Sequence, residues 1–189
     1  MELTEAELIG RFRAGEEDAF EALMKLFEDR TLSLAWYLTG NRDDAMDITQ
    51  EAFIRMYRVL PRWEPKASLF TWLYRVVVNL TRDRGRRLAR EGRVGLEEVP
   101  ETADRRTDTS PGGALGDEEI GRHIRSAVSR LPRRQREAFV LRHYQECTIR
   151  EIAEIQGCSE GAVKANLFHA VRKLRRLLRD FYAGAPGET

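Results

Sequence analysis

Residues 148–174 read TIREIAEIQGCSEGAVKANLFHAVRKL, and this stretch decides the fold of the C-terminal part of the chain. Thr148 and Glu151 form a capping box, in which each side chain binds a free backbone N–H at the start of a helix. Gly157 suits a left-handed turn, and Ser159 can cap the next helix. This spacing predicts a helix-turn-helix.

The second helix of this motif has a polar outer face. Ala153 is small where the two helices would cross, and Val163 would face back toward the first helix. The outward positions suit phosphates and base edges in a major groove, and they hold Lys164, Asn166, His169, Arg172 and Lys173. An ordinary helical hairpin with a polar face is the alternative. Gln156 stands where an apolar residue is usual.

Helical periodicity extends through most of the chain. Apolar residues recur every three or four positions in residues 1–90, 91–116 are rich in Gly, Pro, Thr and acids, and the helical pattern returns in 117–182. We therefore expect an all-α protein with two small helical domains, 1–90 and 117–182, a flexible linker at 91–116 and a tail at 183–189. Asp117 is expected to cap the first helix of the second domain, and Pro132 to begin the next.

The net charge of +1 conceals an uneven distribution. Residues 1–90 hold 15 basic and 15 acidic side chains, residues 91–121 hold 3 and 9, and residues 122–182 hold 14 and 6. A basic C-terminal block behind an acidic spacer is typical of a nucleic-acid-binding unit, although an Arg-rich solvated surface would give the same count.

Composition excludes several classes of protein. The sequence is 42% hydrophobic and 33% charged, which suits an ordered helical protein, and no window resembles a membrane span or a signal peptide. We expect a cytoplasmic protein without membrane insertion. Cys147 and Cys158 form no CxxC pair, so neither a disulfide framework nor a zinc ribbon is indicated. We expect no metal and no cofactor.

The helix expected from Ser68 combines aromatic and basic residues. Three aromatic residues, Phe70, Trp72 and Tyr74, precede a basic stretch. The arginines of this stretch are Arg75, Arg82, Arg84, Arg86, Arg87 and Arg90. Aromatic rings can stack on exposed bases while arginines bind the backbone of a single strand. The alternative is that Phe70 and Trp72 belong to the core.

An acidic helix face lies upstream, in residues 43–53. Its acids and an amide lie opposite Ala45, Ile48 and Ala52, which would be buried. Such a face fits a basic protein partner, or it is simply solvated.

Two sets of motifs together resemble a known family. Residues 47–53, DITQEAF, followed by residues 70–75, FTWLYR, and Asn79, resemble conserved region two of the extracytoplasmic-function (ECF) sigma factors, within the sigma-70 superfamily. Leu131-Pro132, Arg136, residues 151–153 and residues 161–164 resemble region four. The motifs occur in the family's order and spacing, and they cover nearly the whole chain outside the linker.

The resemblance implies a non-enzymatic transcription initiation factor that directs RNA polymerase to promoters and assists promoter opening. Its partners would be core RNA polymerase, promoter DNA and an anti-sigma factor. The implied polymerase dock is Asp47, Gln50, Glu51 and Phe53. The implied minus-ten binding and melting residues are Trp63, Lys66, Phe70, Trp72, Arg75, Asn79, Arg82, Arg86 and Arg87. The implied minus-thirty-five residues are Ser159, Lys164, Ala165, Asn166, Phe168, His169 and Arg172.

The loop at 62–67 and Asn79 carry a more specific hypothesis. The loop offers aromatic, acidic and basic groups in one short turn, and Asn79 has both a donor and an acceptor for a base edge. We expect these groups to trap a base from the non-template strand, and we expect substitutions from Trp63 to Lys66 to leave thermal stability unchanged.

Three rival interpretations remain on sequence grounds. A plain helix-turn-helix regulator accounts for the second domain but leaves residues 47–53 and 70–79 unexplained. A DNA-processing enzyme lacks support, because no GxxxxGK phosphate loop and no set of residues with metal-ligand spacing occurs. His143, Cys147, Cys158 and His169 would have to gather to bind zinc or sense oxidation, and scattered cysteines are more often packed as hydrophobes.

Overall fold

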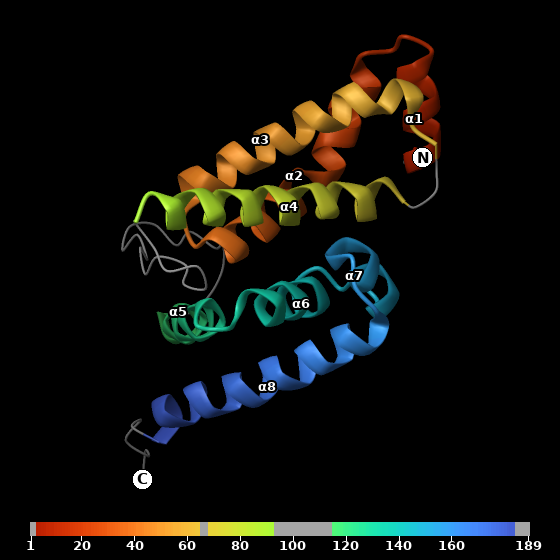
Figure 1. The fold of residues 1–189 in the computed structure, drawn as a ribbon. Helices are drawn as coiled ribbons and strands as arrows, with labels where there is room; N and C mark the ends of the chain where they lie inside the picture. The colour runs from red at the N-terminus through yellow and green to blue at the C-terminus, as the bar shows by residue number, and fades with distance from the viewer. Residues whose placement is uncertain (1–2, 65–67, 93–114, 184–189) are drawn as a thin grey trace.

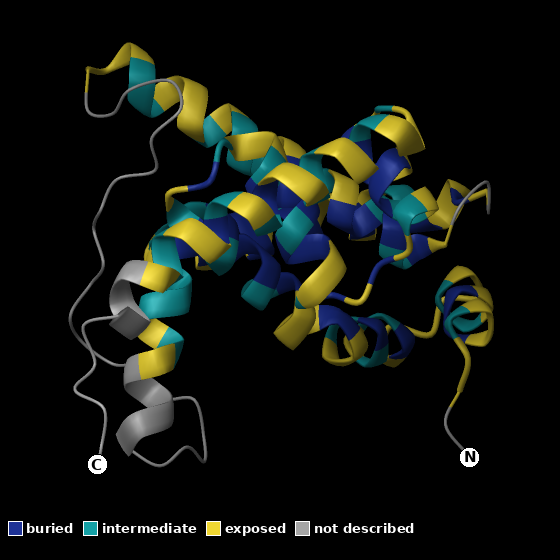
Figure 2. Cartoon of the chain, turned by 90° about the horizontal axis from the view of Figure 1, so that it is seen from below, coloured by how far each residue is buried: buried dark blue, intermediate teal, exposed yellow. Residues whose placement is uncertain are grey.

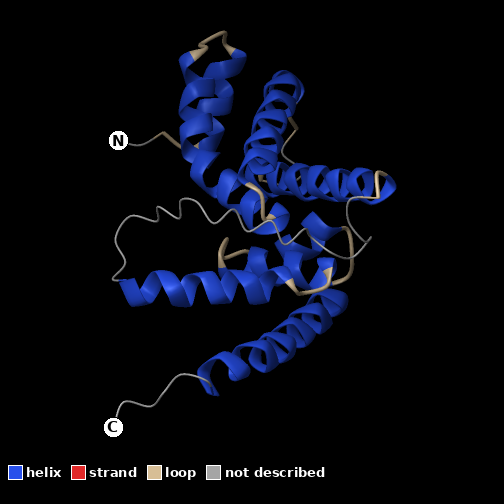
Figure 3. Ribbon diagram, turned by 90° about the vertical axis from the view of Figure 1, so that its left-hand side faces the viewer, coloured by secondary structure: helices blue, strands red, loops and turns tan. Residues whose placement is uncertain are grey.

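A computed structural model describes residues 3–64, 68–92 and 115–183, and for 115–119 and 180–183 it describes the backbone alone. All regular structure in these ranges is helical (Figure 3), which confirms the expected all-α class. The predicted linker lies outside the described residues except at its two ends, and so do Lys66 and the tail beyond Ala183. No helix in the described ranges is long and apolar enough to cross a membrane.

The first domain contains four α-helices and one short 3-10 helix. They are α1 (Glu5–Arg13), α2 (Asp18–Thr39), α3 (Arg42–Val59), η1 (Leu60–Arg62) and α4 (Leu69–Arg90). Helices α2, α3 and α4 pack on one another, and α1 lies near the start of α2 and the end of α3 (Figure 1). Their shared core includes Leu23, Leu34, Met56, Leu73 and Val77, all fully buried. Burial of each such side chain contributes about 1.5–3 kcal/mol.

The second domain contains α5 (Leu115–Ser129), α6 (Arg133–His143), α7 (Ile149–Gln156) and α8 (Glu160–Ala183). Helix α5 begins two residues before the predicted cap at Asp117, and Pro132 is the N-cap of α6 rather than its first residue. Helices α7 and α8 form the predicted helix-turn-helix. Val163 is fully buried and Ala153 is 8% exposed, as expected where the two helices meet.

The predicted helix boundaries follow from local hydrogen bonds. Both capping boxes form, one at Thr4 and Glu7 and the other at Thr148 and Glu151. The Ser68 side chain caps α4, and the Ser159 hydroxyl accepts from the Ala162 N–H at 3.2 Å. Gly157 ends α7 with a φ of 65°, in the left-handed region where a side chain would be strained.

The two domains pack directly against each other. Helix α4 contacts α7, and α2 contacts α6, so α4 lies between the rest of the first domain and the second domain (Figure 1). Buried residues are concentrated in the middle of the molecule, while the outer faces of the helices are exposed (Figure 2). One face of α4 is therefore covered by the domain that carries the helix-turn-helix.

Candidate nucleic-acid interface

An open groove of about 730 Å³ runs between α2 and α3. Asp47 and Gln50, predicted to dock polymerase, are exposed and line it. Phe53 also lines the groove but is only 8% exposed. Glu51 does not line it and instead pairs with Arg55 at 2.8 Å. Three of the four predicted docking residues thus meet at one groove.

The groove includes exposed apolar residues that the sequence prediction missed. Met46 is 50% exposed, Ile54 is 40% exposed and Tyr57 is 48% exposed. All three lie on α3 and line the groove. With Gln50 they recur at spacings of four, four and three residues, so helical periodicity contained a second stripe beside the buried one. An exposed apolar stripe with an acid and an amide suits a protein partner.

Helix α4 presents a row of exposed polar and basic side chains. We name it the α4 row, and its residues are Arg75, Asn79, Arg86 and Arg87. Arg86 also pairs with Asp83 within the helix. Because the groups extend over more than three helical turns, they can contact several consecutive nucleotides.

The predicted aromatic residues are less accessible than the α4 row. Trp63 is only 8% exposed and packs edge-to-face on the half-buried Trp72, with ring centroids 5.7 Å apart. The expectation that substitutions at Trp63 leave stability unchanged is not supported, because removing a buried Trp typically costs about 3–5 kcal/mol. Phe70 is half-buried, and its ring packs at a tilt against that of Tyr74; the Arg30 guanidinium carbon lies over the Phe70 ring, 5.3 Å from its centroid.

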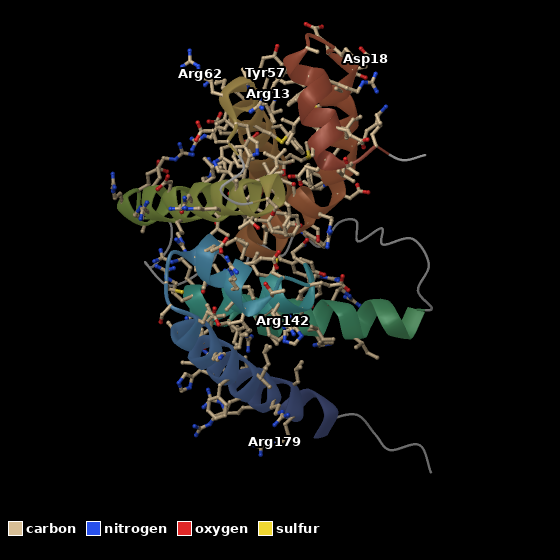
Figure 4. The ribbon with its side chains drawn as sticks, turned by 90° about the vertical axis from the view of Figure 1, so that its right-hand side faces the viewer. Arg13, Asp18, Tyr57, Arg62, Arg142 and Arg179 are labelled. Atoms are coloured by element: carbon tan, nitrogen blue, oxygen red, sulfur yellow. The ribbon has the colours of Figure 1, made fainter. Side chains whose placement is uncertain are left out.

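Most of the residues predicted to face the minus-thirty-five element are exposed on α8. Exposed residues on it are Lys164, Ala165, Phe168, His169 and Arg172; Asn166 is half-buried, and Ser159, also exposed, caps the helix. Phe168 is 64% exposed, the largest value among the large hydrophobic side chains described. A groove of about 1090 Å³ continues from this face past Arg175, Arg176 and Arg179. Arg179 lies far from the first domain (Figure 4).

Arg82, also predicted to bind DNA, is engaged between the domains. Its guanidinium donates to both carboxylate oxygens of Glu137 on α6, at 2.9 and 2.6 Å. The Glu137 side chain is 2% exposed and that of Arg82 is 12% exposed. These hydrogen bonds raise the pKa of Arg82. A two-pronged Arg–carboxylate pair is among the strongest polar contacts in proteins.

Gln156 completes this pair. Its amide donates to Glu137 at 3.0 Å and to the Arg134 carbonyl at 3.0 Å. This explains why a buried position that usually holds an apolar residue holds Gln156 here, since Glu137 would otherwise have an unsatisfied oxygen lone pair. We name Arg82, Glu137 and Gln156 the interdomain clasp.

Further polar contacts join the two domains. The Tyr74 hydroxyl donates to the Gln145 side chain, and Arg30 donates to the Gln145 carbonyl at 3.3 Å. Arg136 donates across the boundary to the Leu38 carbonyl at 3.3 Å, and burial lowers its pKa to about 10. None of these contacts was predicted, because each joins residues distant in sequence.

The cysteines and histidines do not form a site. Within the described ranges, no group of three or more His, Cys, Asp or Glu residues is placed to hold a metal ion. Burial raises the pKa of Cys147 to about 12, so its thiol is protonated and unreactive at neutral pH. His143 packs on Phe139, and burial lowers its pKa.

Comparison with known proteins identifies both domains. The family described as Sigma-70 region 2 matches residues 23–91, and the family Sigma-70, region 4, matches residues 122–174. The ECF RNA polymerase sigma factor SigW of Bacillus subtilis is 31% identical, with 95% of this chain and all of that protein covered. The ECF RNA polymerase sigma-E factor of Escherichia coli is 28% identical over 89% of this chain and 91% of its own.

Solved structures share the fold. CnrH, in complex with the cytosolic domain of CnrY, superposes with a TM-score of 0.67 at 22% identity, over 92% of this chain and 96% of that one. The sigma factor RpoE of Bartonella quintana, in complex with the anti-sigma factor NepR, superposes with a TM-score of 0.65 at 24% identity, over 85% of this chain and 96% of that one.

The interdomain clasp should stabilise the folded chain. Removing one partner of a buried ion pair typically costs about 3–5 kcal/mol, and the lower end applies here because Arg82 lies near the surface. We expect Glu137→Ala to lower the melting temperature by roughly 6–12 °C. The matched control is Glu154→Ala, which breaks the exposed ion pair with Arg150 and should lower the melting temperature by about 0–4 °C. Equal melting temperatures for the two variants would contradict the assignment.

Proposed function

The chain belongs to the extracytoplasmic-function sigma factors of the sigma-70 family, and from that membership we propose how its surfaces divide the work of initiation. As a sigma factor it binds RNA polymerase, recognises promoters and assists initiation, and it has no catalytic activity of its own. We propose that the α2–α3 groove binds polymerase, the α4 row binds the minus-ten element and α8 binds the minus-thirty-five element. Such a factor would act in the cytoplasm, where polymerase transcribes.

The single observation that carries this division is the separation of three surfaces of different chemistry. The α2–α3 groove is mostly apolar, and its polar lining residues are two acids, an amide, a threonine and an arginine. The α4 row is basic with one amide, and the outer face of α8 is basic with an exposed aromatic ring. An apolar groove suits a protein, whereas basic faces suit nucleic acid.

The α4 row suits the open form of the promoter. Arginines neutralise phosphates, and Asn79 can both donate to and accept from a base edge. The Watson–Crick edge of a base is available for such pairing only after the strands separate, so contacts to that edge favour the open over the closed promoter. Lys66 and the loop around it are proposed to add to this site.

Helix α8 suits duplex DNA. Lys164, Ala165 and Phe168 lie toward its N-terminal end, which a helix-turn-helix places against base edges. Arg175, Arg176 and Arg179 follow along the helix and are proposed to bind phosphates. An apolar contact from Phe168 with a thymine methyl group would add sequence preference.

Promoter binding is proposed to require the two domains to separate. Glu137 binds Nε and one Nη nitrogen of Arg82, an edge of the guanidinium that could otherwise hold a phosphate, and the Arg82 side chain is only 12% exposed. Arg82 is therefore proposed to bind either the second domain or DNA. The described arrangement corresponds to the free protein, and polymerase and promoter would stabilise the separated one.

An anti-sigma partner is also proposed. Both structural relatives named above were solved as complexes, one of them with a protein called an anti-sigma factor. Their similarity supports the shared fold, and family membership supports the extension to this chain. The α2–α3 groove is the proposed place for such a partner, because occupying it would exclude polymerase.

The polymerase dock is tested by substitution at the groove. We expect Asp47→Ala, Gln50→Ala and Glu51→Ala together to weaken binding to purified core polymerase at least tenfold, while helical circular dichroism is retained. The control is Glu21→Ala with Asp29→Ala, which removes the same charge from exposed positions of α2 outside the groove. If the triple variant binds core like the parent, or the control is equally weak, the groove is not the dock.

Base capture is tested at Asn79, because this residue is exposed and its loss should change stability by less than about 0.5 kcal/mol. We expect Asn79→Ala to reduce permanganate reactivity of promoter thymines by roughly 5–30-fold, the factor for 1–2 kcal/mol of lost contact. Transcription should recover on a template mismatched at the minus-ten element. Normal promoter melting by this variant would show that Asn79 does not hold a base.

A further inference from the structure

Helix α1 contacts both ends of the connection between η1 and α4. At the last residue of α1, the Arg13 guanidinium donates to the Leu60 carbonyl at 3.3 Å and also to the Trp63 carbonyl, where the connection begins. At the first residue of α1, the Glu5 carboxylate accepts from the Leu69 N–H at 2.9 Å, where the connection ends. One short helix therefore binds the backbone on both sides of the segment that is proposed to meet the minus-ten element.

Among the described residues, two of these bonds reach backbone groups that have no other backbone partner. The Trp63 carbonyl lies just past the end of η1, and the Leu69 N–H is at the first turn of α4, where helices have no internal partners, whereas the Leu60 carbonyl already accepts from the Trp63 N–H at 3.2 Å. The Ser68 hydroxyl accepts from the Thr71 N–H, so the Leu69 N–H is free to donate to the Glu5 carboxylate. Within the described residues, the Trp63 carbonyl and the Leu69 N–H are thus bound by side chains of α1 and by no local backbone group.

Helix α1 itself is firmly held. Leu8 and Ile9, which lie between the two residues, are 4% and 7% exposed. Phe12 packs on Phe20 and on Tyr57, with ring centroids 5.7 and 5.4 Å apart. Glu5 and Arg13 are eight residues apart, so about 12 Å of helix separates them along the axis. Figure 4 places Arg13 near Arg62 and Tyr57, at the end of α3.

We propose that Glu5 and Arg13 are positioning residues for promoter opening, which hold the two ends of the η1–α4 connection at a fixed separation. This inference rests on the proposed minus-ten site. A base is captured by binding, and a segment with loose ends must be ordered at that moment, at a cost in affinity. Ends already fixed to α1 remove that cost. The residues touch no base and act through the backbone of Trp63 and Leu69.

The experiment compares four variants of the full chain, each assembled with core polymerase on a duplex promoter. Arg13→Ala and Glu5→Ala remove one end each. Glu5→Gln keeps an oxygen acceptor for the Leu69 N–H. Arg11→Ala is the matched control, because Arg11 lies on the same helix but pairs with Glu16 instead. The measurements are permanganate reactivity, affinity for core and melting temperature.

We expect Arg13→Ala and Glu5→Ala each to reduce promoter opening by roughly 5–30-fold, the factor for ordering about one residue at binding. Affinity for core should be unchanged, and opening should recover on a template mismatched at the minus-ten element. Glu5→Gln and Arg11→Ala should open the promoter like the parent.

Three outcomes would overturn the proposal. Normal opening by both Ala variants would show that the ends need no support. Failure of Glu5→Gln or Arg11→Ala to the same degree would show a general loss of α1. If promoter opening falls in proportion to melting temperature across the four variants, Glu5 and Arg13 have a purely structural role. This holds even when an Ala variant is poorly folded. Failure of the underlying function is distinguishable, because Asn79→Ala would then open the promoter normally.

Discussion

The burial of one carboxylate constrains the whole arrangement. Glu137 is almost completely removed from water, and an unpaired charge in that position would cost several kcal/mol. Arg82 of the first domain and Gln156 of the second satisfy it. Since the cation comes from α4 and the anion from α6, the second domain cannot leave α4 without exposing both to solvent. The side-by-side placement of the domains follows from this pair and from the Tyr74 and Arg136 contacts around it.

Helix α4 consequently has three roles on three faces. Leu73 and Val77 pack into the first domain, Tyr74 and Arg82 bind the second domain, and Asn79 with its neighbours faces solvent. On the proposed minus-ten assignment, the DNA-facing side and the domain-facing side meet at Arg82, so promoter binding and domain closure would compete for one guanidinium. The Glu5 side chain of α1 holds the start of the same helix at Leu69. Access to the proposed minus-ten site would then depend on where the second domain lies.

Sequence reasoning succeeded where the determinant was local. Capping boxes, the Gly157 turn and the spacing of Val163 are set within a few residues, and they gave the helices and the helix-turn-helix. It failed where partners are distant. Nothing near Arg82 in the sequence points to Glu137, 55 residues away, and nothing near Gln156 explains a polar residue at a buried position whose partners are Glu137 and the Arg134 carbonyl. The prediction places Trp63 in an accessible loop, which is wrong. Its burial depends on packing against Trp72 and on the Arg13 side chain of α1, and neither contact is visible in the local sequence.

The most direct test of domain closure is a distance measurement in solution. Fluorophores are placed through Glu21→Cys on α2 and Arg150→Cys on α7, both exposed, in a Cys158→Ser background that leaves the buried Cys147. The free protein should show one short distance, and addition of core polymerase with promoter DNA should replace it with a long one. Glu137→Ala should shift the free protein partly toward the long distance. A distance that stays short while permanganate detects an open promoter would contradict the account.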